Sequence, residues 1–173
     1  MTAVATPLLV NVVELLRRPG TVKEVLVSVA CDDLTFDDPR IVDEPVEVAL
    51  RLESLSNGIV VDGSVSATWH GECRRCLAPI RVREAVGIEE LYQRVVEDPD
   101  AHPIVGEQID LLPMVRENVL VSLPVGPLCR PDCPGFCGQC GADLSEGPCG
   151  CEPVAGDPRW SALDALKERP TGD

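Results

Sequence analysis

Aromatic residues and histidines are scarce in this sequence. Aromatic side chains make up 3% of the 173 residues, and the two histidines are His70 and His102. A core with so few rings must be built mainly from Val, Leu, Ile and Ala. Neither histidine lies in an arrangement typical of a Cys–His nucleophile, so we expect ordinary strand or loop residues. No glycine-rich phosphate loop is present either, and we predict no enzymatic activity and no small-molecule substrate.

Basic residues are few as well. Lys and Arg number 15 against 29 Asp and Glu, which gives a formal net charge of −14. A protein that coats nucleic acid needs a basic surface, so this balance argues against that function and favours a basic protein partner. Four arginines near one predicted hairpin tip are the exception. Arg74 and Arg75 could touch RNA there, whereas Arg81 and Arg83 are explained more simply as solvated residues of an exposed strand.

No apolar run approaches the length of a transmembrane helix. The N-terminal run 5–16 has no basic residue before it and contains Pro7, Asn11 and Glu14, so it does not resemble a secretion signal. We therefore expect a cytoplasmic protein without membrane association. Thiols stay reduced in the cytosol, so nine cysteines with two Cys-x-x-Cys pairs favour metal binding over disulfides.

The sequence does contain a clear alternation of apolar and polar residues, which is typical of antiparallel strands with one buried face. Asn57-Gly58 lies between two such segments and is a hairpin-turn signal. The next hairpin carries the first Cys-x-x-Cys pair at its tip. The predicted strands cover residues 25–30, 46–53, 59–69 and 80–88, and Ile80 and Val82 of the last one are expected to point inward.

Helical signals are fewer. A helix is predicted over residues 111–123, because apolar residues recur at helical spacing between Asp110, a capping residue, and Pro124. Further helical turns are predicted around residues 12–17 and after Asp157-Pro158. The polar segment 97–107 is expected to be a mobile loop.

These elements indicate an α+β fold in two parts. Residues 1–125 are predicted to form an antiparallel β-sheet domain with one long helix and one or two short ones. Residues 126–173 are predicted to form a Cys-rich zinc-binding module followed by the last helix. Cys31 is far from the other cysteines, and we expect it to be a small buried apolar side chain.

Six cysteines lie between residues 129 and 151, separated by Gly, Pro, Asp and Ser, which form turns rather than a core. Such a segment needs cross-links to fold, and Zn²⁺ held by four thiolates supplies them. We predict two structural zinc ions; adding eight thiolates (−8) and two ions (+4) changes the formal net charge from −14 to −18. The candidate ligands are Cys73, Cys76, Cys129, Cys133, Cys137, Cys140, Cys149 and Cys151.

Two pairings of these ligands are open. In the favoured one, Cys137, Cys140, Cys149 and Cys151 form a local site, because closing so short a loop costs little entropy. Cys73 and Cys76 of the hairpin then share the second ion with Cys129 and Cys133. In the rival pairing the two Cys-x-x-Cys turns share one ion, as they do in zinc ribbons, and the other four cysteines hold the second.

Several motifs in this order resemble the YceD-like large ribosomal RNA subunit accumulation family. The resemblance covers most of the chain and is strongest over residues 69–83 and 109–166, whereas the first 40 residues add little. The motifs are Cys73-Arg-Arg-Cys76-Leu77, Ile109-Asp110-Leu111 with Arg116-Glu117, Leu123-Pro124 with Pro127-Leu128-Cys129, the run from Asp132 to Leu144, Cys149-x-Cys151, and Asp157-Pro158-Arg159-Trp160 with Ala162-Leu163.

This resemblance implies a cytosolic bacterial protein needed for accumulation or processing of large-subunit ribosomal RNA, without a catalytic residue. The acidic composition adds that it acts through a basic ribosomal protein or a large-subunit assembly factor, with any RNA contact indirect or through Arg74 and Arg75. Two alternatives remain: a zinc-thiolate sensor of oxidants or metal, and a zinc-ribbon protein that binds nucleic acid.

Overall fold

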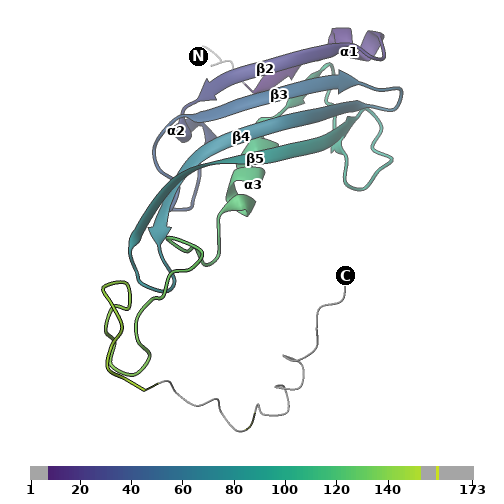
Figure 1. The fold of residues 1–173 in the computed structure, drawn as a ribbon. Coiled ribbons are helices and arrows are strands. Elements are labelled where there is room, and N and C mark those ends of the chain that lie inside the picture. Colours follow the sequence, from purple (N-terminus) through teal and green to yellow (C-terminus); the bar gives the residue numbers. More distant parts are fainter. Residues whose placement is uncertain (1–7, 153–158, 160–173) are drawn as a thin grey trace.

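The fold is a five-stranded sheet with a long hairpin that extends beyond it (Figure 1). The computed structural model describes residues 8–152 and 159. Neighbouring strands are antiparallel, except that the last two run parallel. In spatial order the strands are β2 (Val22–Val29), β3 (Val46–Ser54), β4 (Ile59–Glu72), β5 (Pro79–Gln93) and β6 (His102–Pro103).

The predicted alternation in β3 and β4 is confirmed by the burial of their inner faces. Leu52 lies opposite Val61 and Val48 opposite Val65, and all four side chains are buried. Branched aliphatic side chains pack well on a pleated surface, which is why these residues favour strands. The Asn57-Gly58 signal also holds, because a tight turn joins β3 to β4.

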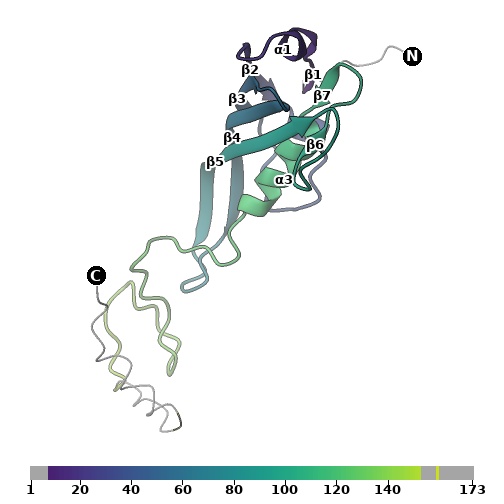
Figure 2. The same ribbon diagram turned by 90° about the vertical axis from the view of Figure 1, so that its right-hand side faces the viewer.

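Helix α3 (Leu112–Ser122) packs on one face of the sheet, and in the described part of the chain no helix covers the opposite face (Figure 2). Met114, Val115 and Val119 are its buried residues. The Asp110 carboxylate accepts the N–H of Leu112, the first residue of this helix, at 3.0 Å, whereas the N-cap position itself is held by Leu111, one residue after the predicted one. None of the helices in the described part of the chain is long and apolar enough to cross a membrane.

Smaller elements complete the domain around the sheet. A two-stranded antiparallel sheet pairs an early segment with the chain just before α3, and its members contribute Val10 and Ile109 to the core. The elements are β1 (Leu9–Asn11), α1 (Val13–Arg17), α2 (Cys31–Leu34) and β7 (Gln108–Asp110).

Four predictions need correction or fall outside the description. Val82 is 41% exposed rather than buried, because the first half of β5 runs past the end of the core. Segment 97–107 is not all loop, since it contains β6. Cys31 is half-buried, because it begins α2 at the surface. The last helix, expected after Asp157, lies outside the described residues.

Candidate metal centres

Eight of the nine cysteines lie in two groups of four. Within each group, all four sulfur atoms lie within 4.8 Å of one another. These are the groups of the favoured pairing, and the two Cys-x-x-Cys turns belong to different groups. We call Cys73, Cys76, Cys129 and Cys133 the front cluster, and Cys137, Cys140, Cys149 and Cys151 the rear cluster.

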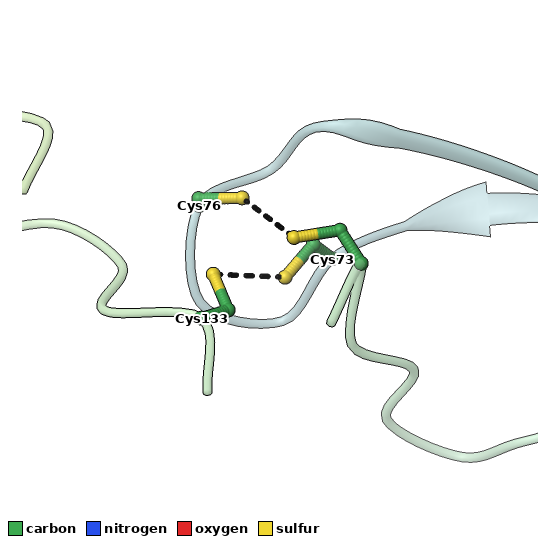
Figure 3. Close-up of side chains that lie close together, drawn as sticks. Cys73, Cys76 and Cys133 are labelled. Carbon is green, nitrogen blue, oxygen red and sulfur yellow. Dashed lines mark hydrogen bonds between the residues drawn. The ribbon is translucent and has the colours of Figure 1, made fainter. Parts of the chain in front are cut away.

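The sulfur spacing in the front cluster fits a tetrahedral metal site. The Sγ atoms of Cys73 and Cys133 are 3.7 Å apart, and those of Cys76 and Cys129 are 3.6 Å apart (Figure 3). A disulfide would bring two sulfurs to about 2.05 Å. Four sulfurs at about 2.3 Å from one zinc ion lie about 3.8 Å from each other. The two distances are too long for disulfides and are compatible with four sulfurs around one metal ion.

The front Cys-x-x-Cys turn is shaped to stabilise a thiolate. Leu77 N–H donates to the carbonyl of Cys73 at 2.9 Å, and Cys73 N–H donates to Ala78 O at 2.9 Å. Inside this turn, Arg75 N–H points at Cys73 Sγ from 3.5 Å. The residue after the second cysteine, Leu77, has the left-handed φ of 59°.

The rear turn repeats this geometry. Gly141 N–H donates to Cys137 O and Cys137 N–H to Ala142 O, both at 2.8 Å, and Gln139 N–H lies 3.5 Å from Cys137 Sγ. The position that Leu77 holds in the front turn is held here by Gly141, with a φ of 73°. Each turn thus aims an N–H group at its first sulfur, which stabilises the thiolate form of that cysteine.

The front cluster joins the hairpin tip to the segment that follows α3. Arg74 N–H donates to Pro127 O at 2.9 Å, and the Arg75 guanidinium donates to Cys133 O at 2.7 Å. Phe136 N–H in turn donates to Arg75 O at 3.2 Å. Cys73 and Cys133 are fully buried where the two segments meet.

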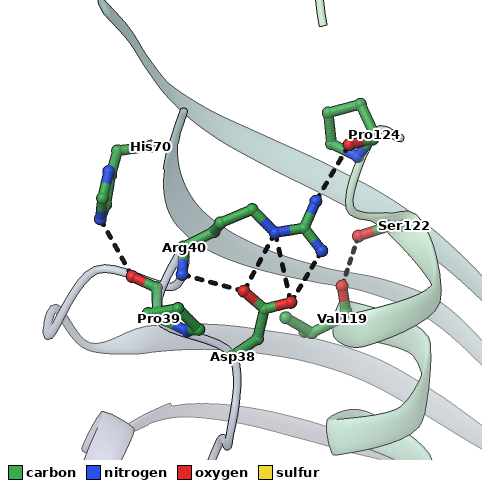
Figure 4. A network of polar contacts seen from close by, with 7 residues as sticks. All are labelled: Asp38, Pro39, Arg40, His70, Val119, Ser122 and Pro124. Carbon is green, nitrogen blue, oxygen red and sulfur yellow. Dashed lines mark hydrogen bonds and ion pairs between the residues drawn. The ribbon is translucent and has the colours of Figure 1, made fainter. Parts of the chain in front are cut away.

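Arg40 fixes the path of the chain towards this junction (Figure 4). Its guanidinium donates to the carbonyl of Pro124, just after α3, at 3.0 Å and forms an ion pair with Asp38 at 2.7 Å. Its carbonyl accepts the N–H of His70 in β4 at 2.8 Å, and His70 Nε2 donates to Pro39 O at 3.0 Å. One loop therefore ties the end of α3 to the base of the hairpin arm.

The rear cluster lies in a self-contained loop. Leu144 N–H donates to Gly135 O at 2.9 Å, and the Asp143 carboxylate accepts Ser145 N–H at 2.8 Å. The side chain of Gln139 closes the loop by donating to Glu152 O at 2.7 Å. None of the four rear sulfur-bearing residues is buried, and Cys140 is exposed. The rear cluster is thus more accessible than the front one.

The pKa values of the front thiols diverge. Burial by itself would raise the pKa of Cys73, but the N–H groups of Cys129, Arg75 and Cys76 outweigh it and lower the pKa to about 6. The neighbouring thiol of Cys133, together with burial, raises the pKa of Cys129 to about 12. Four sulfurs this close cannot all ionise without a cation between them.

The rear thiols diverge in the same way. N–H groups of Cys140 and Gln139 lower the pKa of Cys137 to about 6. The thiols of Cys140 and Cys149 raise the pKa of Cys151 to about 12. Each cluster by itself therefore favours one thiolate, whereas a bound dication would allow four.

The other candidate residues lie outside the clusters. His102 pairs with Glu90 at 3.4 Å and stacks on Tyr92, His70 is bound to Pro39 O, and neither histidine belongs to a cysteine cluster. Arg81 forms an ion pair with Glu44 at 2.7 Å. Arg83 approaches the carbonyl of Pro45 and the carboxylate of Glu47, and Arg75 is bound to Cys133 O. Of the four arginines near the hairpin tip, Arg74 is the one whose guanidinium has no hydrogen bond or ion pair with a described residue.

Sequence reasoning missed the role of Gly135. Its φ is 70°, and a Cβ atom there would lie 2.8 Å from Arg75 O, so a glycine is needed for the two segments to meet. The only signal was a glycine two residues after a cysteine and two before the next one.

Comparison with known proteins places both clusters inside one matched region. Residues 61–167 match the family model described as large ribosomal RNA subunit accumulation protein YceD. Uncharacterized protein Rv2926c of Mycobacterium tuberculosis is 37% identical over 92% of this chain and 81% of its own length. ML1660 of Mycobacterium leprae is 32% identical over 91% and 76%, and YlbN of Bacillus subtilis is 27% identical over 50% and 52%. No solved structure matches.

Proposed function

Because the chain belongs to the large ribosomal RNA subunit accumulation family YceD, we propose that it is a non-enzymatic factor for accumulation or processing of large-subunit ribosomal RNA. The observation that carries this proposal is the family match over residues 61–167. That range includes most of the β4–β5 hairpin, α3 and both cysteine clusters. The family name itself supports a role in accumulation of this RNA and leaves the mechanism open.

In this proposal each cluster holds one structural zinc ion. Support comes from the donor set of four sulfurs and from the 3.6 and 3.7 Å spacings in the front cluster. Zinc bound there would neutralise part of the thiolate charge and cross-link distant segments. The chain itself also contributes to the two sites. The buried Cys73 and Cys133 join the hairpin to the chain after α3, and the N–H groups of the two turns stabilise the first thiolate of each cluster.

A non-enzymatic role is supported by the surroundings of the clusters. Four sulfurs complete a tetrahedral zinc site, which leaves no position for a reacting water or substrate. His70 is bound to Pro39 O and His102 to Glu90, so no described histidine can act as a base on a cysteine.

The partner that suits this chain best is a basic protein of the large subunit or an assembly factor. The net charge of −14 attracts a basic protein and repels a bare RNA backbone. Of the four arginines near the tip, three are bound within the chain, which leaves Arg74 for a direct RNA contact. RNA contact is therefore secondary in this proposal.

Depletion in the source bacterium tests the proposed function. We expect large-subunit ribosomal RNA to fall relative to small-subunit RNA, and its precursors to accumulate. A copy with Cys31→Ser should restore the ratio, whereas Cys133→Ser should not, because Cys31 belongs to neither cluster. Unchanged RNA ratios after depletion would overturn the proposal.

A pull-down at moderate salt tests the nature of the partner. Large-subunit proteins should remain bound after nuclease treatment. Recovery of ribosomal RNA alone, equally well after protease treatment, would exclude a protein partner.

The accessible rear cluster favours a second candidate function, a zinc-thiolate sensor of peroxide. Two molecules of hydrogen peroxide would oxidise four thiolates to two disulfides, with release of Zn²⁺; the peroxide takes up four protons from solvent and is reduced to four molecules of water. In a sensor, mild peroxide removes zinc and partner binding together, whereas a structural factor keeps both until it unfolds. The zinc-ribbon alternative has less support, because the two Cys-x-x-Cys turns lie in different clusters.

A further inference from the structure

Leu77 has a backbone conformation that a glycine would adopt at a lower cost in free energy. Its φ of 59° is in the left-handed region, where a branched side chain costs free energy that a glycine avoids. The rear turn has the same hydrogen bonds and places Gly141 at the equivalent position. A glycine would therefore serve the front cluster at least as well, and the leucine side chain itself calls for an explanation.

That side chain is displayed in solvent on a rigid support. Leu77 is 60% exposed at the end of the longest hairpin. Its N–H is bound to Cys73 O, and the next residue, Ala78, accepts the N–H of Cys73, so the turn is closed on both sides. A fixed, exposed apolar side chain pays little ordering entropy on binding, which is a property of interface anchors.

The surroundings of Leu77 have the composition of a protein interface. Phe136 is 42% exposed and borders the turn, because its N–H is bound to Arg75 O. Val125 is fully exposed and directly precedes Gly126, which lies against the Arg74 side chain. The stem of Arg74 lies across Gly126, and its guanidinium has no bond to any described residue. Apolar side chains beside one uncommitted arginine are typical of interface centres.

The local charge favours a protein over RNA. Arg74, Arg75 and Arg130 exceed Glu72 and Asp132 by one positive charge, while four thiolates around one dication contribute −2. Two of these arginines already have partners within the chain: the Arg75 guanidinium donates to Cys133 O, and Arg130 forms an ion pair with Asp132. A surface with a net charge of about −1 is poorly matched to phosphates.

We propose that the hairpin tip docks on a protein of the large ribosomal subunit, with Leu77 inserted in an apolar pocket and Arg74 paired with a carboxylate at its edge. This inference rests on the proposed function and names the contact surface for it. The front cluster is then the device that holds Leu77 and Arg74 in a fixed position relative to Val125 and Phe136.

The test measures binding of the full zinc-loaded chain, labelled at its N-terminal amine, to purified large ribosomal subunits and to protein-free large-subunit RNA. Leu77→Gly should raise Tm, because the left-handed strain is relieved, and yet weaken subunit binding roughly tenfold or more. Leu77→Ala should weaken binding similarly without the gain in Tm. Leu26→Ala is the matched control, because Leu26 is 71% exposed on β2, away from the tip. Arg74→Gln should weaken binding, and Arg81→Gln should not.

Three results would overturn the inference. If both Leu77 variants bind large subunits as tightly as the wild-type chain does, the hairpin tip is not the docking site, and the proposed function is unaffected. Equal affinity for protein-free RNA makes RNA the partner. Absence of any binding to subunits by the wild-type chain refutes the ribosomal partner, and with it this docking site.

Discussion

Replacement of Gly135 by alanine should release the segment after Cys133 from the hairpin tip. Gly135 has a φ of 70°, and its carbonyl accepts the N–H of Leu144. An added Cβ would lie 2.8 Å from Arg75 O and 3.0 Å from Arg75 Cβ. Arg75 O is a backbone atom and Arg75 Cβ is bonded directly to the backbone. Neither atom can move aside unless the backbone of Arg75 shifts, and that backbone lies between the two hairpin ligands Cys73 and Cys76 of the front cluster.

The expected cost follows from two separate effects. A left-handed φ costs an alanine about 1–2 kcal/mol. Relief of the two close contacts requires a backbone shift, and overpacking of this kind costs about 1–3 kcal/mol. The sum, about 2–5 kcal/mol, should appear in the metal affinity of the front cluster, because docking and metal binding are coupled. At 1.4 kcal/mol per factor of ten, the loss is about 30-fold or more.

Two other glycines of the module separate these effects. A Cβ at Gly138 meets nothing within 4 Å and its φ is not in the left-handed region, so Gly138→Ala should leave both affinities unchanged. Gly141 has a φ of 73° in open space, so Gly141→Ala should weaken only the rear cluster, by about 1–2 kcal/mol. Competition with a chromophoric zinc chelator measures both sites.

The contrast among the three variants can refute the reasoning. If Gly135→Ala binds zinc at the front cluster as tightly as Gly138→Ala does, the close approach to Arg75 is not a constraint. If Gly135→Ala weakens the rear cluster instead, the junction is assigned to the wrong group of cysteines.

Two further predictions concern protonation and the α3 junction. In the metal-free protein, thiolate absorbance should appear near pH 6 for Cys73 and Cys137, while Cys129 and Cys151, with a pKa of about 12, stay protonated. Because the pKa values of Cys73 and Cys137 are lower in the folded protein than in the unfolded chain, their ionisation should stabilise the fold as pH rises from about 6 to 9. This stabilisation should be lost on acidification through pH 6. A single transition near pH 9 would contradict this. Arg40→Met should lower Tm and speed amide exchange beside Pro124, whereas Arg51→Met, which removes exposed ion pairs, should change neither.

Much of the fold could be predicted from local patterns. The alternation in β3 and β4 and the Asn57-Gly58 turn depend on neighbours in the sequence, so the structure follows them closely. Val82 was assigned to the wrong environment, because its alternation is regular while the core that would cover it stops short. Where a strand leaves its core depends on the elements that pack against it and cannot be read from the strand itself.

The division of the cysteines into two groups could also be predicted from the sequence, but the contacts around them could not. Loop length favoured the rear group, and elimination then gave the front one, as the structure has it. The contacts that close the front junction were not predictable, because Arg40 and Arg75 act on carbonyls that lie more than 50 residues away in the sequence. The sequence left Arg74 and Arg75 as possible RNA contacts, whereas the structure shows that the Arg75 guanidinium donates to the backbone carbonyl of Cys133 in the front cluster.

The central claim is that two separate four-cysteine sites each hold one zinc ion. Native mass spectrometry of the wild-type chain, Cys73→Ser, Cys140→Ser and the double variant tests it most directly. We predict two ions in the wild-type chain, one in each single variant and none in the double variant, because the two cysteines belong to different clusters. If the double variant keeps one ion, the two Cys-x-x-Cys turns share a site and the account is wrong.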